Sequence, residues 1–264
     1  MTWGMKTVFS MLVADKNPTT HKERVRQRLY GPSVTREYVS VEAGAPFCII
    51  TAKKYKGIIP WYSVSSAAKG CLLLPEGEIP PQDAEIERFR PTRLPVRMLM
   101  NSAYLAMKQL RLPAEKVCLS VFDEQGILAD LLVRFVPLAR HIRVITERTD
   151  KYEQLCNTLM YSYGMSPLIT KNADASVLSS TVIISYNFRQ EFCSYTGILF
   201  TDSVCDAPRA TVMRGEGVKL PEEYERHLPD GISRINYAAA LYEKCGVLRL
   251  GDICFEKVRA QTAP

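Results

Sequence analysis

The stretch from Val117 to Asn187 constrains the fold most, because short β-branched runs alternate there with segments of helical period. We expect strands at residues 117–122, 142–146 and 181–186, a strand and loop at 167–180, and helices at 130–140 and 151–163. Each strand and its following helix occupy roughly 25 to 30 residues, which is typical of parallel sheets whose crossovers are helices. The sequence therefore predicts an α/β fold in which helices cover both faces of a parallel sheet.

The length of the chain and the change in its composition along the sequence predict more than one folding unit. At 264 residues the chain exceeds the common size of a single domain. We expect a smaller amino-terminal α+β domain over residues 1–95, a connecting amphipathic helix over 96–112, and a Rossmann-like domain over 113–264. The carboxyl-terminal segment of that last domain can pack back on the amino-terminal domain.

Further elements are expected outside the central stretch, most of them bounded by glycine, proline or charged residues. They are a hairpin-like pair of strands at 36–42 and 47–52, short strands at 55–59, 71–74 and 197–201, helices at 21–28, 60–68, 96–110 and 233–244, and a turn at 215–217. Residues 6–14 fit either a strand or a short helix, because a short apolar run has no decisive period.

Composition excludes several classes of protein. No apolar run approaches the roughly 20 residues that span a bilayer, so we expect a cytoplasmic protein without a membrane segment. The eight cysteines include no C-x-x-C pair, and the three histidines lie far apart. We therefore expect no metal site, and we expect the thiols to be reduced and mostly buried.

The formal net charge of +6 is mild, with a local basic cluster at His21–Arg28. Such a cluster can contact an acidic partner or nucleic acid. Val25 and Leu29 have the i, i+4 spacing that anchors the opposite face of a helix, and no nucleic-acid-binding motif accompanies the cluster. We therefore interpret the cluster as a solvated helix face and disfavour nucleic acid as a partner.

The turn after the first strand of the central stretch is the candidate phosphate site. A dinucleotide fingerprint needs a tight turn, a glycine that lets the backbone approach the pyrophosphate, and a small residue where the helix meets the sheet. Gly126 and Ala129 fill the last two positions. Glu124 stands where the first glycine belongs. Asp123 precedes it, and Asp130 follows at the start of the expected helix. Two like charges ~4 Å apart repel by about 1 kcal/mol in water and by more in a cleft, so these acids oppose a pyrophosphate.

Further ligand groups are expected where the neighbouring strands end. Glu147 lies roughly 20 residues beyond Gly126, where an acidic group binds an adenosine ribose, and Arg148 can hold a 2′-phosphate. Any NAD(P) or nucleotide is therefore expected to contact Gly126, Ala129, Glu147, Arg148, Thr149 and Asn187.

The run Glu147–Arg148–Thr149, followed by Lys151, resembles the cofactor-binding domain of the shikimate dehydrogenase and glutamyl-tRNA reductase group. The second strand of that domain ends in Asn-Arg-Thr before a lysine-bearing helix, so Glu147 takes the asparagine position. The resemblance covers residues 115–190 and implies an NAD(P)-binding Rossmann domain. The acidic turn replaces the glycine-rich turn of the family, and residues 1–95 lack its lysine-bearing substrate motif, so no catalytic residue carries over.

Two hypotheses about function stay open. In the first, a small-molecule or nucleotide ligand lies in a crevice formed by residues 123–129, 146–149 and 185–187. In the second, the chain is a non-catalytic interaction or regulatory protein that kept the fold and lost the cofactor. The carboxylates near the same edge, Asp123, Glu124, Glu147 and Asp202, could instead hold a divalent cation, although solvated caps are more common for such residues. The chain has no GxSxG, GxxxxGK[ST] or HExxH motif, so no reaction follows, and self-association also stays open.

Overall fold

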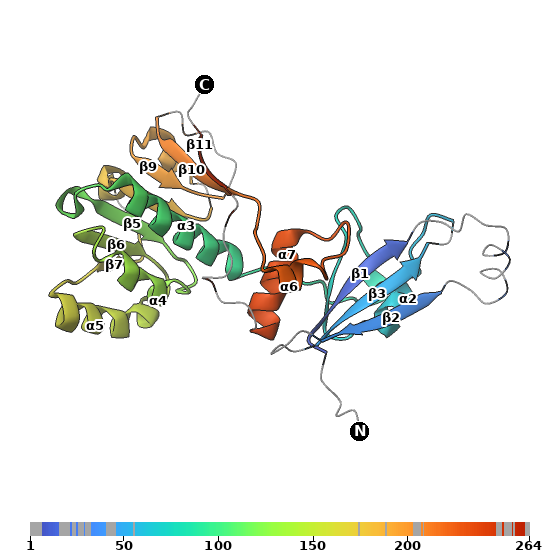
Figure 1. Cartoon of the computed structure of the whole chain (residues 1–264). Coiled ribbons are helices and arrows are strands. Elements are labelled where there is room, and N and C mark those ends of the chain that lie inside the picture. Colours follow the sequence, from blue (N-terminus) through green and yellow to red (C-terminus); the bar gives the residue numbers. More distant parts are fainter. Residues whose placement is uncertain are drawn as a thin grey trace. The chain divides into compact units, whose positions relative to one another are not determined.

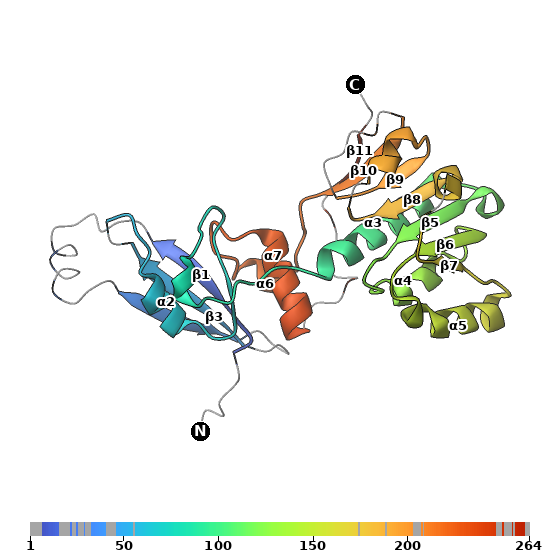
Figure 2. The same ribbon diagram turned by 180° about the vertical axis from the view of Figure 1, so that it is seen from behind.

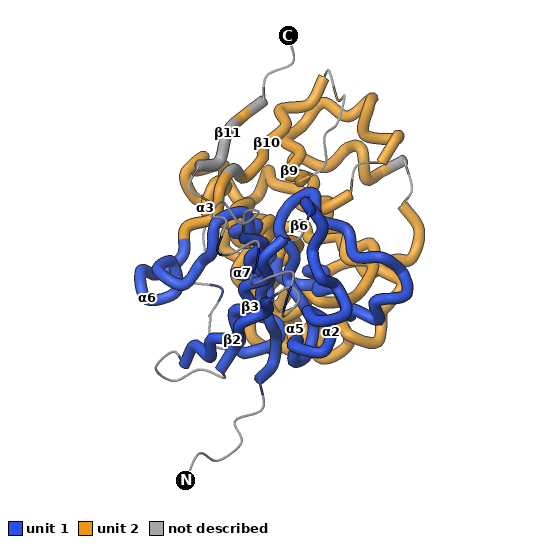
Figure 3. The backbone as a smooth tube through the Cα atoms, turned by 90° about the vertical axis from the view of Figure 1, so that its right-hand side faces the viewer, with its two compact units in different colours: residues 1–94, 220–253 blue, residues 95–219, 254–264 orange. Residues whose placement is uncertain are grey.

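The structure is a computed structural model that describes residues 7–15, 22, 25, 29, 33–40, 46–54, 56–173, 175–187, 189–202, 207, 209–246, 250, 255 and 257–261. The chain divides into two compact units (Figure 3). The first unit comprises Met1–Leu94 and Leu220–Ile253, and the second comprises Pro95–Lys219 and Cys254–Pro264. Each unit therefore combines segments that are far apart in the sequence.

The first unit is built on a four-stranded sheet in the order β2-β3-β1-β4. Its strands are β1 (Phe9–Asp15), β2 (Val34–Val39), β3 (Phe47–Lys53) and β4 (Cys71–Leu73). β1 runs parallel to β3 and β4, whereas β2 pairs with β3 in antiparallel fashion, as expected for a hairpin-like connection. The helices of this unit that the structure describes in full are α2 (Trp61–Ala67), η1 (Gln82–Ala84), α6 (Glu222–Glu225), α7 (Arg234–Ala240) and the π-helical η7 (Leu241–Cys245).

Aromatic side chains tie the two segments of the first unit together. Phe9 of β1 stacks on Phe47 of β3, with ring centroids 5.1 Å apart. Tyr237 of α7 meets the same Phe47 ring edge-on at 5.9 Å and is fully buried. α7, far along the sequence from β1 and β3, thus contributes to the hydrophobic core of this unit.

The second unit contains a seven-stranded sheet in the order β11-β10-β9-β8-β5-β6-β7. Its strands are β5 (Cys118–Phe122), β6 (His141–Ile145), β7 (Leu168–Thr170), β8 (Val182–Ser185), β9 (Ile198–Phe200), β10 (Thr211–Glu216) and β11 (Lys257–Gln261). The first six are all parallel, and β11 is antiparallel to β10. The predicted parallel α/β sheet is therefore confirmed, and its strand order is consistent with a Rossmann-like fold.

The helical elements of the second unit lie around this sheet (Figures 1 and 2). They are α3 (Leu94–Leu110), η2 (Ala114–Lys116), α4 (Ala129–Leu132), η3 (Val133–Phe135), η4 (Thr149–Tyr152), α5 (Glu153–Tyr163), η5 (Ala175–Ser179) and η6 (Gln190–Ser194). α3 ends at Leu110, and the next residue, Arg111, adopts a left-handed φ of 48° shortly before Pro113. α5 ends at Gly164, a left-handed C-cap with φ 61°.

The helix expected at residues 130–140 is much shorter than predicted. The structure has only α4 and η3 there, and residues 136–138 form a turn. Pro137 has no N–H to donate to the carbonyl of Val133, so a regular helix does not continue through this position.

Two other local predictions are wrong. Lys56 and Gly57 have positive φ values of 51° and 81°, so the expected strand 55–59 contains a turn. The turn expected at 215–217 is observed only at its last residue. β10 continues through Glu216, and Gly217, with φ 67°, lies in a bend. A Cβ on Gly215 would lie 2.3 Å from the ring of Phe255, so this glycine admits an aromatic side chain against the sheet.

Some expectations fall on parts of the chain that the structure does not describe. The basic helix at 21–28 lies outside the described residues except for Lys22 and Val25. Among the helices that are described, none has both the length and the apolar character needed to cross a bilayer. The cysteines with described side chains are free thiols, of which Cys48 and Cys71 are buried and Cys193 is exposed.

Candidate functional site

The carboxyl ends of the parallel strands meet at one edge of the sheet in the second unit. The chain runs from β5 to β6 and β7 on one side, and from β8 to β9 and β10 on the other. In open α/β sheets, ligands bind in the crevice outside the carboxyl ends of the strands at such a reversal. The segments that follow β5, β6, β7 and β8 are therefore the ones that can form a binding site.

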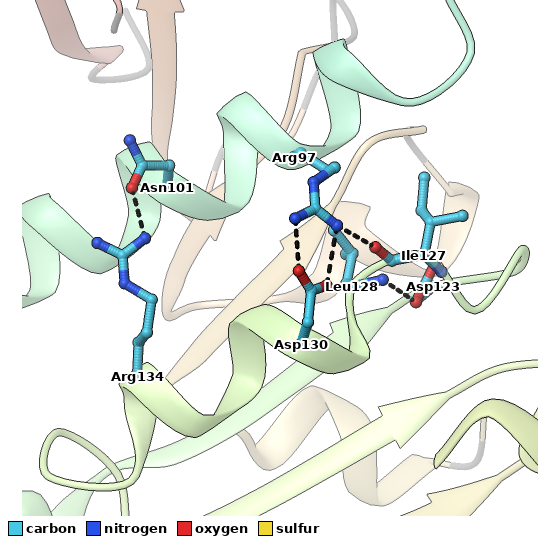
Figure 4. Close-up of polar contacts among 7 residues, drawn as sticks. All are labelled: Arg97, Asn101, Asp123, Ile127, Leu128, Asp130 and Arg134. Atoms are coloured by element: carbon cyan, nitrogen blue, oxygen red, sulfur yellow. Dashed lines mark hydrogen bonds and ion pairs between the residues drawn. The ribbon is translucent and has the colours of Figure 1, made fainter. Parts of the chain in front are cut away.

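Asp123 directly follows β5, and its carboxylate lies beside the backbone N–H of Leu128 (Figure 4). Its Oδ1 accepts the N–H of Ile127 at 3.1 Å, and its Oδ2 accepts the N–H of Leu128 at 2.8 Å. Oδ2 also accepts the hydroxyl of Tyr152 at 2.5 Å, and Asp123 is only 3% exposed. Burial and the Asp123 carboxylate raise the pKa of Tyr152, so its hydroxyl stays protonated and donates. The backbone amides of Ile127 and Leu128, just before α4, therefore already donate to a carboxylate of the chain itself, that of Asp123.

Gly126 lies at the tip of this turn with a left-handed φ of 66°. A Cβ at this position would lie 2.9 Å from the Cβ of Arg148 and 2.9 Å from the Cγ of Lys151. The segment that follows β6 thus packs closely on the glycine. The space above Gly126, where a dinucleotide fingerprint would admit a pyrophosphate, is occupied by these two side chains.

Arg97 of α3 fixes the other side of the turn (Figure 4). Its Nη1 donates to the carbonyl of Ile127 and to Oδ1 of Asp130, both at 2.8 Å, and its Nη2 donates to Oδ2 of Asp130 at 2.6 Å. The guanidinium therefore forms a bidentate ion pair with Asp130, and the residue is 8% exposed. Further along α3, Asn101 Oδ1 accepts Nη1 of Arg134 at 2.8 Å, so two bridges join α3 to the α4–η3 segment.

An open crevice of about 480 Å³ lies at the carboxyl edge of the sheet. Segments after β5, β6, β7 and β8 line it, through Glu124, Ile145, Thr146, Glu147, Lys171, Asn172, Ala173, Arg189 and Glu191. Arg189 pairs with Glu124 at 2.6 Å, and its guanidinium lies 4.7 Å from the centre of the Phe122 ring. With Glu124 paired in this way, the charged groups left to meet a ligand include Glu147, Lys171 and Glu191.

Of the six predicted site residues, Glu147 lines the crevice and the other five do not. Glu147 is exposed and lines the crevice. Gly126 and Ala129 belong to the closed turn and to the first residue of α4. The Arg148 guanidinium pairs with Asp150 at 2.9 Å and thereby holds the pKa of that carboxyl below its usual value.

The last two predicted residues lie beside these groups. Thr149 is the first residue of η4, which follows Arg148. Asn187 is exposed after β8, and its carbonyl accepts the hydroxyl of Ser185 at 2.7 Å. Neither residue lines the crevice.

Several residues that shape this edge were missed by sequence reasoning. Lys171 and Arg189 follow β7 and β8, and a stricter application of the carboxyl-edge rule would have included both. Tyr152 and Arg97 gave no comparable signal. They reach Asp123 and Asp130 across 29 and 33 positions in the sequence, and no short motif marks either pair.

In the described part of the chain, no group of three or more histidine, cysteine, aspartate or glutamate side chains is arranged to hold a metal ion. Of the carboxylates considered for a divalent cation, Asp123 is engaged by two amides and a hydroxyl, and Glu124 by Arg189. No family model, curated protein or solved structure matches the chain. The fold and the crevice thus define an α/β protein with a charged carboxyl-edge crevice, and the resemblance of residues 115–190 to a dehydrogenase domain stays a prediction.

Proposed function

We propose that the second unit binds a small nucleoside or nucleotide in the carboxyl-edge crevice and holds no dinucleotide pyrophosphate on the turn at Gly126. The observation that carries the proposal is the lining of the crevice by charged side chains from four successive strand ends. Glu147 is placed after β6, where a carboxylate accepts hydrogen bonds from ribose hydroxyls. Lys171 supplies an exposed positive charge for an anionic group of the same ligand.

The exclusion of a pyrophosphate rests on the Asp123 carboxylate. On a dinucleotide-binding turn the pyrophosphate accepts N–H groups at the start of the helix. Here the N–H groups of Ile127 and Leu128 donate to Asp123 instead. A ligand that displaced this carboxylate would leave a buried charge without its partners, which is costly. The proposed ligand is therefore bound through its sugar and a single anionic group.

Thermal unfolding of the full chain tests the proposal with adenosine, AMP, ATP, NAD(H) and NADP(H), each with and without Mg²⁺. A ligand at 100 times its Kd raises the free energy of unfolding by about 2.7 kcal/mol, which gives a measurable shift in Tm. We expect such a shift with AMP. We also expect NAD(H) to bind no more tightly than AMP, because the turn offers its second phosphate no free amide.

Matched substitutions locate the binding. Glu147→Gln removes the carboxylate that accepts the ribose hydroxyls and should weaken AMP binding about tenfold. Glu115→Gln makes the same change on the exposed η2 and should leave binding unchanged. The proposal is refuted if no ligand shifts the Tm, if both variants respond alike, or if NAD(H) binds orders of magnitude more tightly than AMP.

A second candidate function, a non-catalytic interaction protein, is supported by the exposed apolar side chains of residues 160–168. Tyr161 is 90% exposed, and Met160, Tyr163 and Leu168 are each more than half exposed. Exposed apolar side chains close together in sequence favour a protein-binding surface. Absence of any ligand shift, together with concentration-dependent sedimentation that Tyr161→Ser abolishes, would favour this candidate.

A further inference from the structure

The first unit contains a pocket of about 370 Å³ that the proposed function does not use. It is lined by Cys71, Glu87, Arg88, Phe89, Arg90, Thr92, Arg93, Glu243 and Lys244. Four of these nine side chains are cationic and two are acidic. The lining therefore carries an excess of positive charge.

The backbone places the arginines of this pocket on its exposed side. Residues 87–89 pair with β4, where Leu72 donates its N–H to the carbonyl of Glu87 at 2.8 Å and accepts the N–H of Phe89 at 2.9 Å. Phe89 is 5% exposed and anchors the segment in the core. Because successive side chains of an extended chain point to opposite sides, Arg88 and Arg90 are left exposed.

One of the two acids, Glu243, is hydrogen-bonded by the chain itself. The Glu243 carboxylate accepts the N–H groups of Arg93 and Leu94 at 2.9 and 2.8 Å. It also accepts the N–H and the hydroxyl of Thr92, at 3.2 and 3.0 Å. These donors satisfy the hydrogen-bonding capacity of the Glu243 carboxylate, which keeps its negative charge. With four cations and two acids, the lining side chains still carry a net charge of +2.

The cations, in contrast, are available to a ligand. Within the described residues, Arg88, Arg90, Arg93 and Lys244 have no carboxylate at ion-pair distance. All four side chains are exposed. Lys244 is close enough to the buried Cys71 at the pocket wall to oppose the rise that burial causes in the pKa of that thiol.

We propose that this pocket binds a small phosphorylated molecule through Arg88, Arg90, Arg93 and Lys244. Guanidinium groups bind phosphate oxygens in a bidentate manner, and several of them converge on one concavity here. The volume falls in the range of small-molecule sites, roughly 300 to 1,000 Å³. Nucleic acid would instead be matched by an extended basic stripe with aromatic side chains for the bases, so a small ligand is the better fit.

Isothermal titration of the full chain with inorganic pyrophosphate tests the proposal. The double variant Arg90→Gln/Arg93→Gln should weaken pyrophosphate binding about tenfold or more, because two charge-assisted contacts are lost. The control Lys69→Gln/Arg226→Gln removes the same charge from exposed positions of the same unit outside the pocket and should change binding by less than about twofold. Because all four substituted residues are exposed, circular dichroism melts of both variants should match the parent chain.

Four outcomes would overturn the proposal. The first is no binding of pyrophosphate, and the second is equal weakening by both double variants, which would show a general charge effect. The third is binding that Lys171→Gln abolishes and Arg90→Gln/Arg93→Gln does not, which would place the anion in the crevice of the second unit. The fourth is binding of a single-stranded oligonucleotide, but not of pyrophosphate, that depends on Arg90 and Arg93.

Discussion

At the scale of single residues, Asp123 determines the hydrogen bonding of the turn after β5. An acidic residue at this position was expected to repel a phosphate from the surface of the turn. The structure instead buries the carboxylate and satisfies it with two backbone amides and the Tyr152 hydroxyl. Asp123 therefore stabilises the turn from within, and it accepts the two amide N–H groups that a phosphate on this turn would otherwise accept.

Asp123→Ala should lower the free energy of unfolding by about 3 kcal/mol, because two buried amides and one hydroxyl lose their acceptor together. Tyr152→Phe removes only the hydroxyl and should cost about 1 kcal/mol. The midpoints of urea denaturation measure both values. A loss for Asp123→Ala no greater than that for Tyr152→Phe would mean that the turn amides find other acceptors.

Gly126 and Gly164 form a matched pair for a second prediction. Both have left-handed φ values, 66° and 61°, but a Cβ on Gly164 would meet nothing within 4 Å. Gly164→Ala should therefore cost only the conformational penalty of about 1 kcal/mol. Gly126→Ala should cost clearly more, about 2 kcal/mol, because Arg148 and Lys151 must also move. Equal shifts of the two Tm values would contradict the close packing on Gly126.

These residues also show what the sequence could and could not predict about the site. The turn, its glycine and Glu147 were found because each follows a strand with a recognisable pattern. The inward orientation of Asp123 was not, since the same letters fit a solvated cap. Its hydroxyl donor, Tyr152, is 29 positions away and becomes its partner only once β5 and β6 pair.

At the scale of elements, α3 and the α4–η3 segment are coupled by the Arg97–Asp130 ion pair. The Arg97 side chain is 10% exposed and that of Asp130 is 63% exposed, so solvent screens the pair only in part. A double-mutant cycle with Arg97→Ala and Asp130→Ala should give a coupling free energy of about 1 to 2 kcal/mol. The Arg148–Asp150 pair is the control, because both of its side chains are about half exposed and its coupling should be several-fold smaller. Similar couplings for the two pairs would show that burial of Arg97 adds nothing.

The predicted bounds of a helix or strand were accurate where the whole segment carried the pattern, and they failed where one residue, Pro137 or Gly215, decided the local structure. β5, β6, β8 and β9 were expected close to their observed bounds, because each is a mostly apolar run between turns and contains at least one β-branched residue. The helix at 130–140 failed because the apolar period persists past Pro137, whereas the hydrogen bonding does not. Gly215 was mistaken for a turn because its close contact with Phe255 comes from a segment 40 positions later.

At the scale of the whole molecule, the pattern predicted a parallel sheet but not the order of its strands. Alternating strands and helices fix the parallel direction, since a helical crossover returns the chain to the same end of the sheet. The position of β8 beside β5, which creates the crevice, depends on the crossover after β7 reversing direction. In the described part of that crossover the one helical element is η5, and its residues carry no signal for the reversal.

Burial of thiol and phenol groups in both units makes a prediction about alkaline pH. Burial, and to a lesser extent Cys71, raises the pKa of Cys245 from 9.0 to about 11, and burial also raises the pKa values of Tyr152, Tyr195 and Tyr237. The folded chain thus keeps these groups neutral at a pH where the unfolded chain ionises them. Their contribution to stability is complete below the unfolded pKa and is lost as pH rises through the folded pKa.

The Tm of the full chain should therefore be steady near neutral pH and should fall from about pH 9 upward, the thiol contributing between about pH 9 and 11. Cys245→Ala removes one titrating group and should make the decline shallower in that interval, even if its Tm at neutral pH is slightly lower. Cys193→Ala is the matched control, because this thiol is exposed and its removal should leave the slope unchanged. Parallel declines for the parent chain and Cys245→Ala would mean that the Cys245 thiol ionises as readily in the folded chain as in the unfolded one. The fall would then come from the buried tyrosines and from the other thiols whose pKa burial raises, Cys48, Cys71 and Cys156.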